Sequence, residues 1–105
     1  MKGDMLEEWK NDSLLNLSRG YIFIHTPFCG TCQMARKMLH VVENMRDTHV
    51  FYDLNASLFP SFMQEHKVES VPCLLVVEQG EVKERVYAFH SVLHIANLLD
   101  SYEAQ

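Results

Sequence analysis

Hydrophobic residues along this chain follow two kinds of spacing. Short runs rich in aromatic and β-branched residues predict buried strands at 21–25, 49–54 and 71–77. A turn at Gln79 and Gly80 leads into a fourth strand at 81–88. Apolar residues at helical spacing predict helices at 4–17, 32–46, 57–66 and 92–102. The predicted order is therefore helix, strand, helix, strand, helix, strand, strand, helix.

This order predicts an α/β fold. The first two strands and the helix between them form a parallel unit, and the last two strands form a hairpin, so a mixed sheet of four strands with helices on both faces is expected. The N-caps expected for the first and third helices are Asp4 and Ser57. The expected core stripe of the long helix is Met34, Met38, Val41, Val42 and Met45, widened by Ala35 and Leu39. Its expected wet face is Gln33, Lys37, His40, Asn44 and Asp47.

Length and charge narrow the class of protein. The 105 residues fit a single domain, 1–105, which can bury a core without a disulfide or a structural metal. A net charge of −5 with scattered basic residues argues against nucleic-acid binding. No apolar stretch approaches the roughly 18 residues that span a bilayer, and the N-terminal residues lack the apolar segment of a secretory signal. We therefore expect a cytoplasmic monomer that binds neither nucleic acid nor membrane.

Two cysteines, Cys29 and Cys32, stand where the first predicted strand gives way to the long helix. Residues three apart on a helical turn lie roughly 5–6 Å apart, which suits the Cα separation of a disulfide. Unpaired N–H groups and the positive end of the helix dipole favour a thiolate at Cys29, and the thiolate is the form that attacks. Cys32, one turn inside the helix, is expected to be shielded and to resolve the mixed disulfide that Cys29 forms with a substrate.

Other uses of these cysteines stay open at this point. A zinc ion or an iron–sulfur cluster needs ligands beyond Cys29 and Cys32, and the chain offers only Cys73 and six dispersed histidines. Two inert buried cysteines, or a binding module without turnover, are further alternatives. His25 is near enough in sequence to tune the charge of Cys29, although a strand histidine with a satisfied hydrogen bond is the more common case. The spacing favours redox chemistry in a reducing compartment, without a bound metal.

Two segments resemble the signatures of the thioredoxin family. Residues 21–32 are similar to the family's strand and redox motif, with Phe28 in the place of the aromatic residue before the first cysteine. Residues 71–82 are similar to the second signature, whose proline, Pro72 here, is cis and faces the redox pair. The resemblance covers nearly the whole chain. It implies a thioredoxin fold and an enzyme that reduces protein disulfides through a reversible disulfide between the two motif cysteines.

The resemblance also implies which residues meet the substrate. The backbone of Val71 is expected to pair with an incoming segment as a short added strand, and Phe28, Gly30, Thr31 and Pro72 complete the substrate-binding set. The sulfurs themselves carry the electrons, so no cofactor is expected. The expected partners are disulfide-containing proteins and a separate thiol reductase that reduces the pair again.

The chain departs from the family pattern at four positions. Phe23 stands where the family has a buried Asp, and Asp53 stands where a Lys is common on the neighbouring strand. We hypothesise that Asp53 is the general base behind Cys32, the alternative being a solvated or capping Asp near a strand end. Thr31 replaces a common proline, which predicts a less reducing couple. Cys73 follows the cis proline, either as a small strand residue or as a third thiol within reach of the site.

Overall fold

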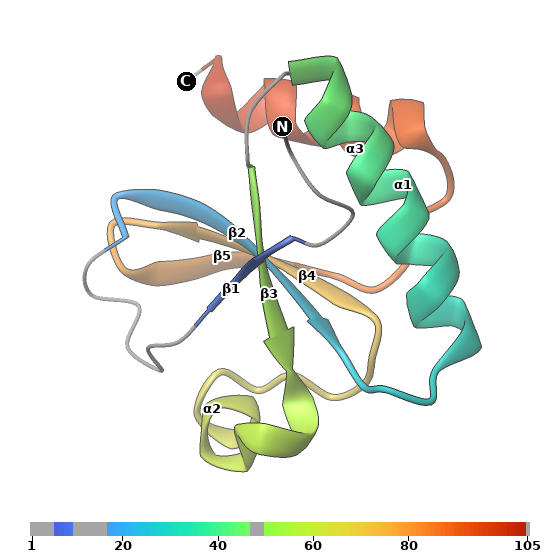
Figure 1. Ribbon diagram of the computed structural model, residues 1–105. Helices are drawn as coiled ribbons and strands as arrows, with labels where there is room; N and C mark the ends of the chain where they lie inside the picture. The colour runs from blue at the N-terminus through green and yellow to red at the C-terminus, as the bar shows by residue number, and fades with distance from the viewer. Residues whose placement is uncertain (1–5, 10–16, 47–49, 105) are drawn as a thin grey trace.

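A mixed sheet forms the centre of the molecule (Figure 1). The computed structural model describes residues 6–9, 17–46 and 50–104, and over these residues five strands lie in the order β1-β3-β2-β4-β5. The strands are β1 (Glu7–Glu8), β2 (Arg19–His25), β3 (Phe51–Asn55), β4 (Cys73–Glu78) and β5 (Glu81–Val86). The helices are α1 (Gly30–Arg46), the 3-10 turn η1 (Ala56–Leu58), α2 (Pro60–Glu65) and α3 (Val92–Glu103).

The strand directions confirm the predicted topology. β2 and β3 run parallel and are joined through α1, whereas β4 and β5 form an antiparallel hairpin. β4 also pairs antiparallel with β2, so the two halves of the sheet meet between these strands. Because parallel strands need a long crossover, α1 returns the chain across one face and leaves its N-terminus at the carboxyl end of β2.

Helices cover both faces of the sheet, as predicted. α1 and α3 lie side by side on one face, and α2 packs at the other (Figure 1). Alternate residues of β2 enter opposite cores: Phe23 packs under α1 and α3, while Ile22 and Ile24 pack with Phe62 of α2. A strand buried on both faces explains why 21–25 is apolar without alternation.

The prediction of an N-terminal helix at 4–17 is wrong at residues 6–9. Glu7 and Glu8 form β1, which pairs parallel with β3, and the N–H of Trp9 donates to the carbonyl of Asp53 at 2.9 Å. Leu6 and Trp9 are three residues apart and lie in the cores on opposite faces of the sheet. That spacing fits one helix face, but on an extended chain it spans both faces. Residues 4–5 and 10–16 lie outside the described residues.

The predicted core stripe of α1 is also wrong in part. Met34, Val41 and Met45 are exposed, and Met38 is only partly buried. The face against the sheet consists of Cys32, Ala35, Leu39, Val42 and Glu43. Apolar residues extend around most of this helix, so their spacing did not identify the packed side. The Glu43 carboxylate is buried because it accepts hydrogen bonds from the backbone N–H groups of Val50 and Phe51, at 2.7 and 2.9 Å.

The segment predicted as one helix at 57–66 is two short elements, η1 and α2. Ser57 does not cap them; its own N–H donates to the Asn55 side chain, which caps η1. Pro60 opens α2, where its missing N–H costs no hydrogen bond. The remaining predicted boundaries differ from the structure by one or two residues, and Val71 and Pro72 precede β4 rather than open it.

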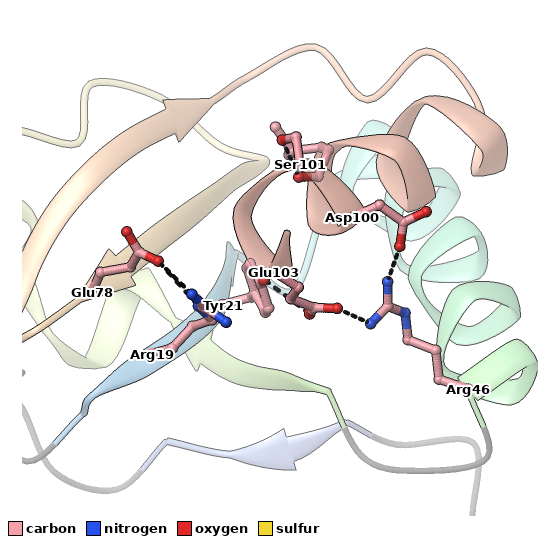
Figure 2. A network of polar contacts seen from close by, with 8 residues as sticks. Arg19, Tyr21, Arg46, Glu78, Asp100, Ser101 and Glu103 are labelled. Carbon is pink, nitrogen blue, oxygen red and sulfur yellow. Dashed lines mark hydrogen bonds and ion pairs between the residues drawn. The ribbon is translucent and has the colours of Figure 1, made fainter. Parts of the chain in front are cut away.

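A polar network connects the C-terminal end of α1 to α3 and β2 (Figure 2). Arg46, the last residue of α1, pairs with Asp100 at 2.8 Å and Glu103 at 2.6 Å on α3. The Tyr21 hydroxyl donates to Glu103 at 3.1 Å, and burial together with this carboxylate raises the pKa of Tyr21 well above its ordinary value, so it stays a donor. These contacts connect α1, α3 and β2 at the C-terminal end of α1. They do not involve its N-terminal end.

Candidate active site

The two motif cysteines lie at the start of α1. β2 ends at His25, and Cys29 directly precedes Gly30, the first helical residue. Cys29 and Cys32 form a disulfide with their Cα atoms 5.1 Å apart, in agreement with the separation expected from their spacing. Cys32 is 3% exposed, whereas Cys29 is only partly buried. A reactant from solution therefore reaches the first sulfur rather than the second.

Hydrogen-bond donors surround the outer sulfur. The backbone N–H of Cys32 donates to Cys29 Sγ at 3.1 Å, and the Thr31 hydroxyl lies 3.4 Å from the same sulfur. The Cys29 carbonyl accepts from the N–H of Gln33 at 3.1 Å, so Cys29 occupies the N-cap position. In the reduced protein these donors and the helix dipole favour the thiolate of Cys29 over the thiol.

Three of the predicted substrate residues lie in or next to the redox motif, and the other two directly precede β4. The Val71–Pro72 peptide bond is cis, which confirms the expectation. Pro72 and Thr31 line one groove of about 280 Å³ beside the redox motif. Phe28 is 100% exposed, and a side chain at Gly30 would meet no atom within 4 Å, so the surface over the motif is open.

Sequence reasoning missed the rest of this groove. Its other lining residues are Met34, Ala35 and Met38 of α1 and Tyr87 and Phe89 after β5. The helical spacing of the methionines predicts a place in the core for them instead. Tyr87 and Phe89 carried no local signal, because they reach the groove only through the fold.

Cys73 is separated from the redox pair by the sheet. It is fully buried in the cluster on the α2 face, opposite to the cluster that contains Cys32. Burial raises the pKa of the Cys73 thiol to about 12, so it stays protonated near neutral pH. Its role as a small strand residue is therefore favoured over that of a third reactive thiol. In the described part of the chain, no three His, Cys, Asp or Glu side chains gather as metal ligands.

Asp53 lies beside Phe23 in the sheet register, so the carboxylate stands one strand away from the position typical of the family. Its Oδ1 is 2.9 Å from His25 Nε2 and 2.8 Å from Arg36 Nη2. Burial alone raises the pKa of Asp53, but the hydrogen bonds and charges of His25 and Arg36 outweigh it, and the net pKa is below the ordinary value. A carboxylate held in this state is a weak proton acceptor near neutral pH. The general-base role of Asp53 stays a hypothesis.

The site's chemistry follows from the unequal exposure of its two sulfurs. The outer sulfur can exchange with an external disulfide, and the inner one can displace that partner without leaving the helix. Proteins with this capacity form the class of thiol–disulfide oxidoreductases, and this protein is one of them.

Among the helices in the described part of the chain, a membrane-spanning segment is not found, because each is too short or too polar for one.

Comparison with known proteins gives the family. A profile of the family described as Thioredoxin matches residues 8–101. Thioredoxin-like protein YusE from Bacillus subtilis (strain 168) is 46% identical over 78 residues, which cover 74% of each chain. A mutant thioredoxin from Halobacterium salinarum NRC-1 has a TM-score of 0.76 at 19% identity, over 92% of this chain and 88% of that one. Reduced desulfothioredoxin from Desulfovibrio vulgaris Hildenborough has a TM-score of 0.73 at 22% identity, over 84% and 85%. The chain belongs to the thioredoxin family and has its fold.

Proposed function

We propose that the protein reduces disulfides of other proteins. The thiolate of Cys29 attacks a substrate disulfide, forms a mixed disulfide and releases one substrate thiolate. Cys32, once deprotonated, then attacks Cys29 Sγ; the Cys29–Cys32 bond forms, the bond to the substrate breaks, and the second substrate thiolate leaves. Two electrons pass to the substrate, and the cysteine pair is oxidised. The observation that carries this proposal is a partly exposed, donor-lined sulfur bonded to a buried one.

The substrate is proposed to bind across the start of α1. The backbone of Val71 would pair with an extended substrate segment, while Pro72 and Thr31 form the wall of the adjoining groove. Phe28 and Gly30 flank the outer sulfur and are exposed, so they are free to contact that segment. Main-chain pairing makes few demands on substrate sequence, which supports protein disulfides as a broad substrate class.

After each turnover the pair must be reduced again. We propose that a separate thiol reductase does this, in the reducing cytoplasm, where the dithiol is maintained. Thr31 between the cysteines changes the relative stability of thiolate and disulfide, and we expect a potential less reducing than that of a typical thioredoxin by tens of millivolts. Equilibration of the pair with glutathione buffers measures this directly.

Insulin reduction by dithiothreitol tests the proposed activity. The wild-type protein should accelerate precipitation of the reduced insulin chain, and Cys29→Ser and Cys32→Ser should abolish the acceleration. Cys73→Ser is the matched control, because its thiol lies on the other face of the sheet, and it should retain the wild-type rate. Retention of activity by Cys29→Ser, or its loss in Cys73→Ser alone, would contradict the proposal.

A further inference from the structure

Two contacts, one aromatic and one polar, hold the His25 ring at the end of β2. The ring stacks on Phe23 with centroids 5.6 Å apart and planes at 18°. Its Nε2 lies 2.9 Å from Asp53 Oδ1 on β3. The same oxygen lies 2.8 Å from Arg36 Nη2, and the Arg36 guanidinium sits over the Phe23 ring, 5.2 Å from its centroid. His25, Asp53 and Arg36 thus form one ordered cluster under α1.

This cluster lies on the α1 side of the sheet, as the redox pair does. His25 is the last residue of β2, four positions before Cys29. Arg36 follows Cys32 by four residues, and residues at this spacing share one face of a helix. Phe23, on which the His25 ring stacks, packs in the same buried cluster as Cys32, and Cys29 packs against that cluster. The contacts therefore lead from the imidazole to the surroundings of the inner sulfur.

The resolving step needs a proton acceptor at this place. Cys32 is buried, so water has little access to its thiol, yet only its thiolate can displace the substrate. We propose that His25, oriented by Asp53, takes up the proton that leaves the Cys32 thiol when the mixed disulfide is resolved. The inference rests on the proposed function. In this proposal Asp53 and Arg36 are positioning residues, and His25 takes the general-base role that was hypothesised from the sequence for Asp53.

The position of the ring nitrogen beside the carboxylate explains this division of roles. His25 Nε2 lies 2.9 Å from Asp53 Oδ1 but makes no hydrogen bond, so this buried nitrogen is available to take up a proton. The same carboxylate then stabilises the imidazolium that forms, as in other carboxylate–histidine pairs. Arg36 keeps Asp53 charged. Histidine is the side chain that most often serves as a general base.

The titratable and charged groups near the ring come from several elements. Asp53 faces it from β3, Arg36 reaches the cluster from α1, and the redox cysteines lie at the start of α1. Cys73 on β4 lies in the core on the opposite face and stays protonated. The proton balance is then complete: the thiol proton passes to His25, the Cys29–Cys32 bond forms, the substrate thiolate leaves, and the imidazolium returns its proton to that thiolate or to water.

Single-turnover reaction of the reduced protein with dithiobis(nitrobenzoate) separates the two steps. Attack by Cys29 releases one coloured nitrobenzoate thiolate, and resolution by Cys32 releases the second. We expect His25→Gln to slow the second release by about tenfold or more near neutral pH and the first release much less, because general bases contribute at least about a hundredfold in many enzymes. Asp53→Asn should slow the second release as well, since a neutral amide no longer stabilises the imidazolium.

Two further measurements distinguish proton transfer from a structural role. Free imidazole should restore the second release in His25→Gly, which a packing defect would not allow. His94→Gln, an exposed histidine on α3, is the matched control and should behave as the wild type. An unchanged second release in His25→Gln, with an unchanged pH profile, overturns the inference and leaves the proposed function intact. Absence of the second release in the wild type would overturn both.

Discussion

The three thiols of this chain differ in reactivity because their surroundings differ. Cys29 is partly exposed and accepts hydrogen bonds at a helix start, Cys32 is buried one turn later, and Cys73 is enclosed by apolar side chains on the other face. A thiolate is favoured by the first environment and opposed by the last. At the scale of single residues, surroundings rather than residue type decide which sulfur attacks.

Alkylation of the reduced protein should follow this order. We predict that iodoacetamide near neutral pH labels Cys29 while Cys73 stays unlabelled, because burial raises the pKa of Cys73 to about 12. Adding urea should expose Cys73 and allow its labelling. Peptide mass spectrometry reports both sites, and rapid labelling of Cys73 in the folded protein would contradict its assigned environment.

Asp53 gives a pH-dependent stability prediction. Because its pKa is lower folded than unfolded, it contributes stability that is present above about pH 4 and is lost as the pH falls through the folded pKa. Arg36→Gln removes one partner and should cost about 1 kcal/mol near neutral pH, with the cost shrinking in acid. Urea unfolding across this pH range measures it.

Arg19→Gln is the control for that series, since Arg19 pairs with Glu78 at a more exposed place. Its effect should stay within about 0.5 kcal/mol. A cost for Arg36→Gln that stays constant from neutral to acid pH would show that the Asp53 contact contributes nothing to it.

At the scale of elements, periodicity predicted long segments well and short ones poorly. The β-α-β unit, the hairpin and the last helix were predictable. Their strands are apolar runs and their helices have apolar residues at helical spacing over several turns. β1 was not, because it is two residues long and Leu6 and Trp9 fit a helix as well as a strand. The packed face of α1 was not either, since Met34 and Val41 are as apolar as the residues that face the sheet.

Trp9 tests whether β1 contributes to the fold. Its side chain is buried in the cluster on the α2 face, and its backbone N–H donates a hydrogen bond to the Asp53 carbonyl of β3. Trp9→Ala should lower the free energy of unfolding by about 3 kcal/mol, the low end for a buried aromatic residue. Leu58→Ala, which truncates an exposed side chain, should change it by less than about 0.5 kcal/mol. Circular dichroism in urea measures both, and equal effects would contradict the packing described for β1.

The candidate site was predictable only where its residues are close in sequence. Cys29, Cys32 and Pro72 stand in short motifs, so sequence identified them. The contacts of Asp53 with His25 and Arg36 join three different elements, and no local pattern reveals them. The same holds for the groove between α1 and the segment after β5.

At the scale of the whole molecule, the two ends of α1 differ in their surroundings. Arg46 connects the C-terminal end of α1 to Asp100 and Glu103 of α3 (Figure 2), whereas the redox pair lies at the N-terminal end of α1. This N-terminal end carries the sulfurs and an open surface with Phe28 at its edge. Arg46 thus fixes the C-terminal end of α1, and the proposed substrate site lies at its N-terminal end.

Substitutions of Phe28 and Met45 test whether the substrate binds at the N-terminal end of α1. Both side chains are exposed, but Met45 lies near the anchored end, about 20 Å along the helix from the sulfurs. Phe28→Ala should lower kcat/KM for insulin about fivefold through lost apolar contact, with little effect on a small disulfide. Met45→Ala should leave both rates unchanged. Equal losses in the two variants would contradict substrate binding at the start of α1.

Capture of the mixed disulfide tests the central claim most directly. Cys32→Ser removes the resolving sulfur, so incubation of this variant, reduced, with oxidised insulin should leave an insulin chain bonded to Cys29, identified by peptide mass spectrometry. The adduct should form near neutral pH and be absent from Cys29→Ser. An adduct on Cys73, or none at all, would contradict the assignment of Cys29 as the attacking thiolate and Cys32 as its resolving partner.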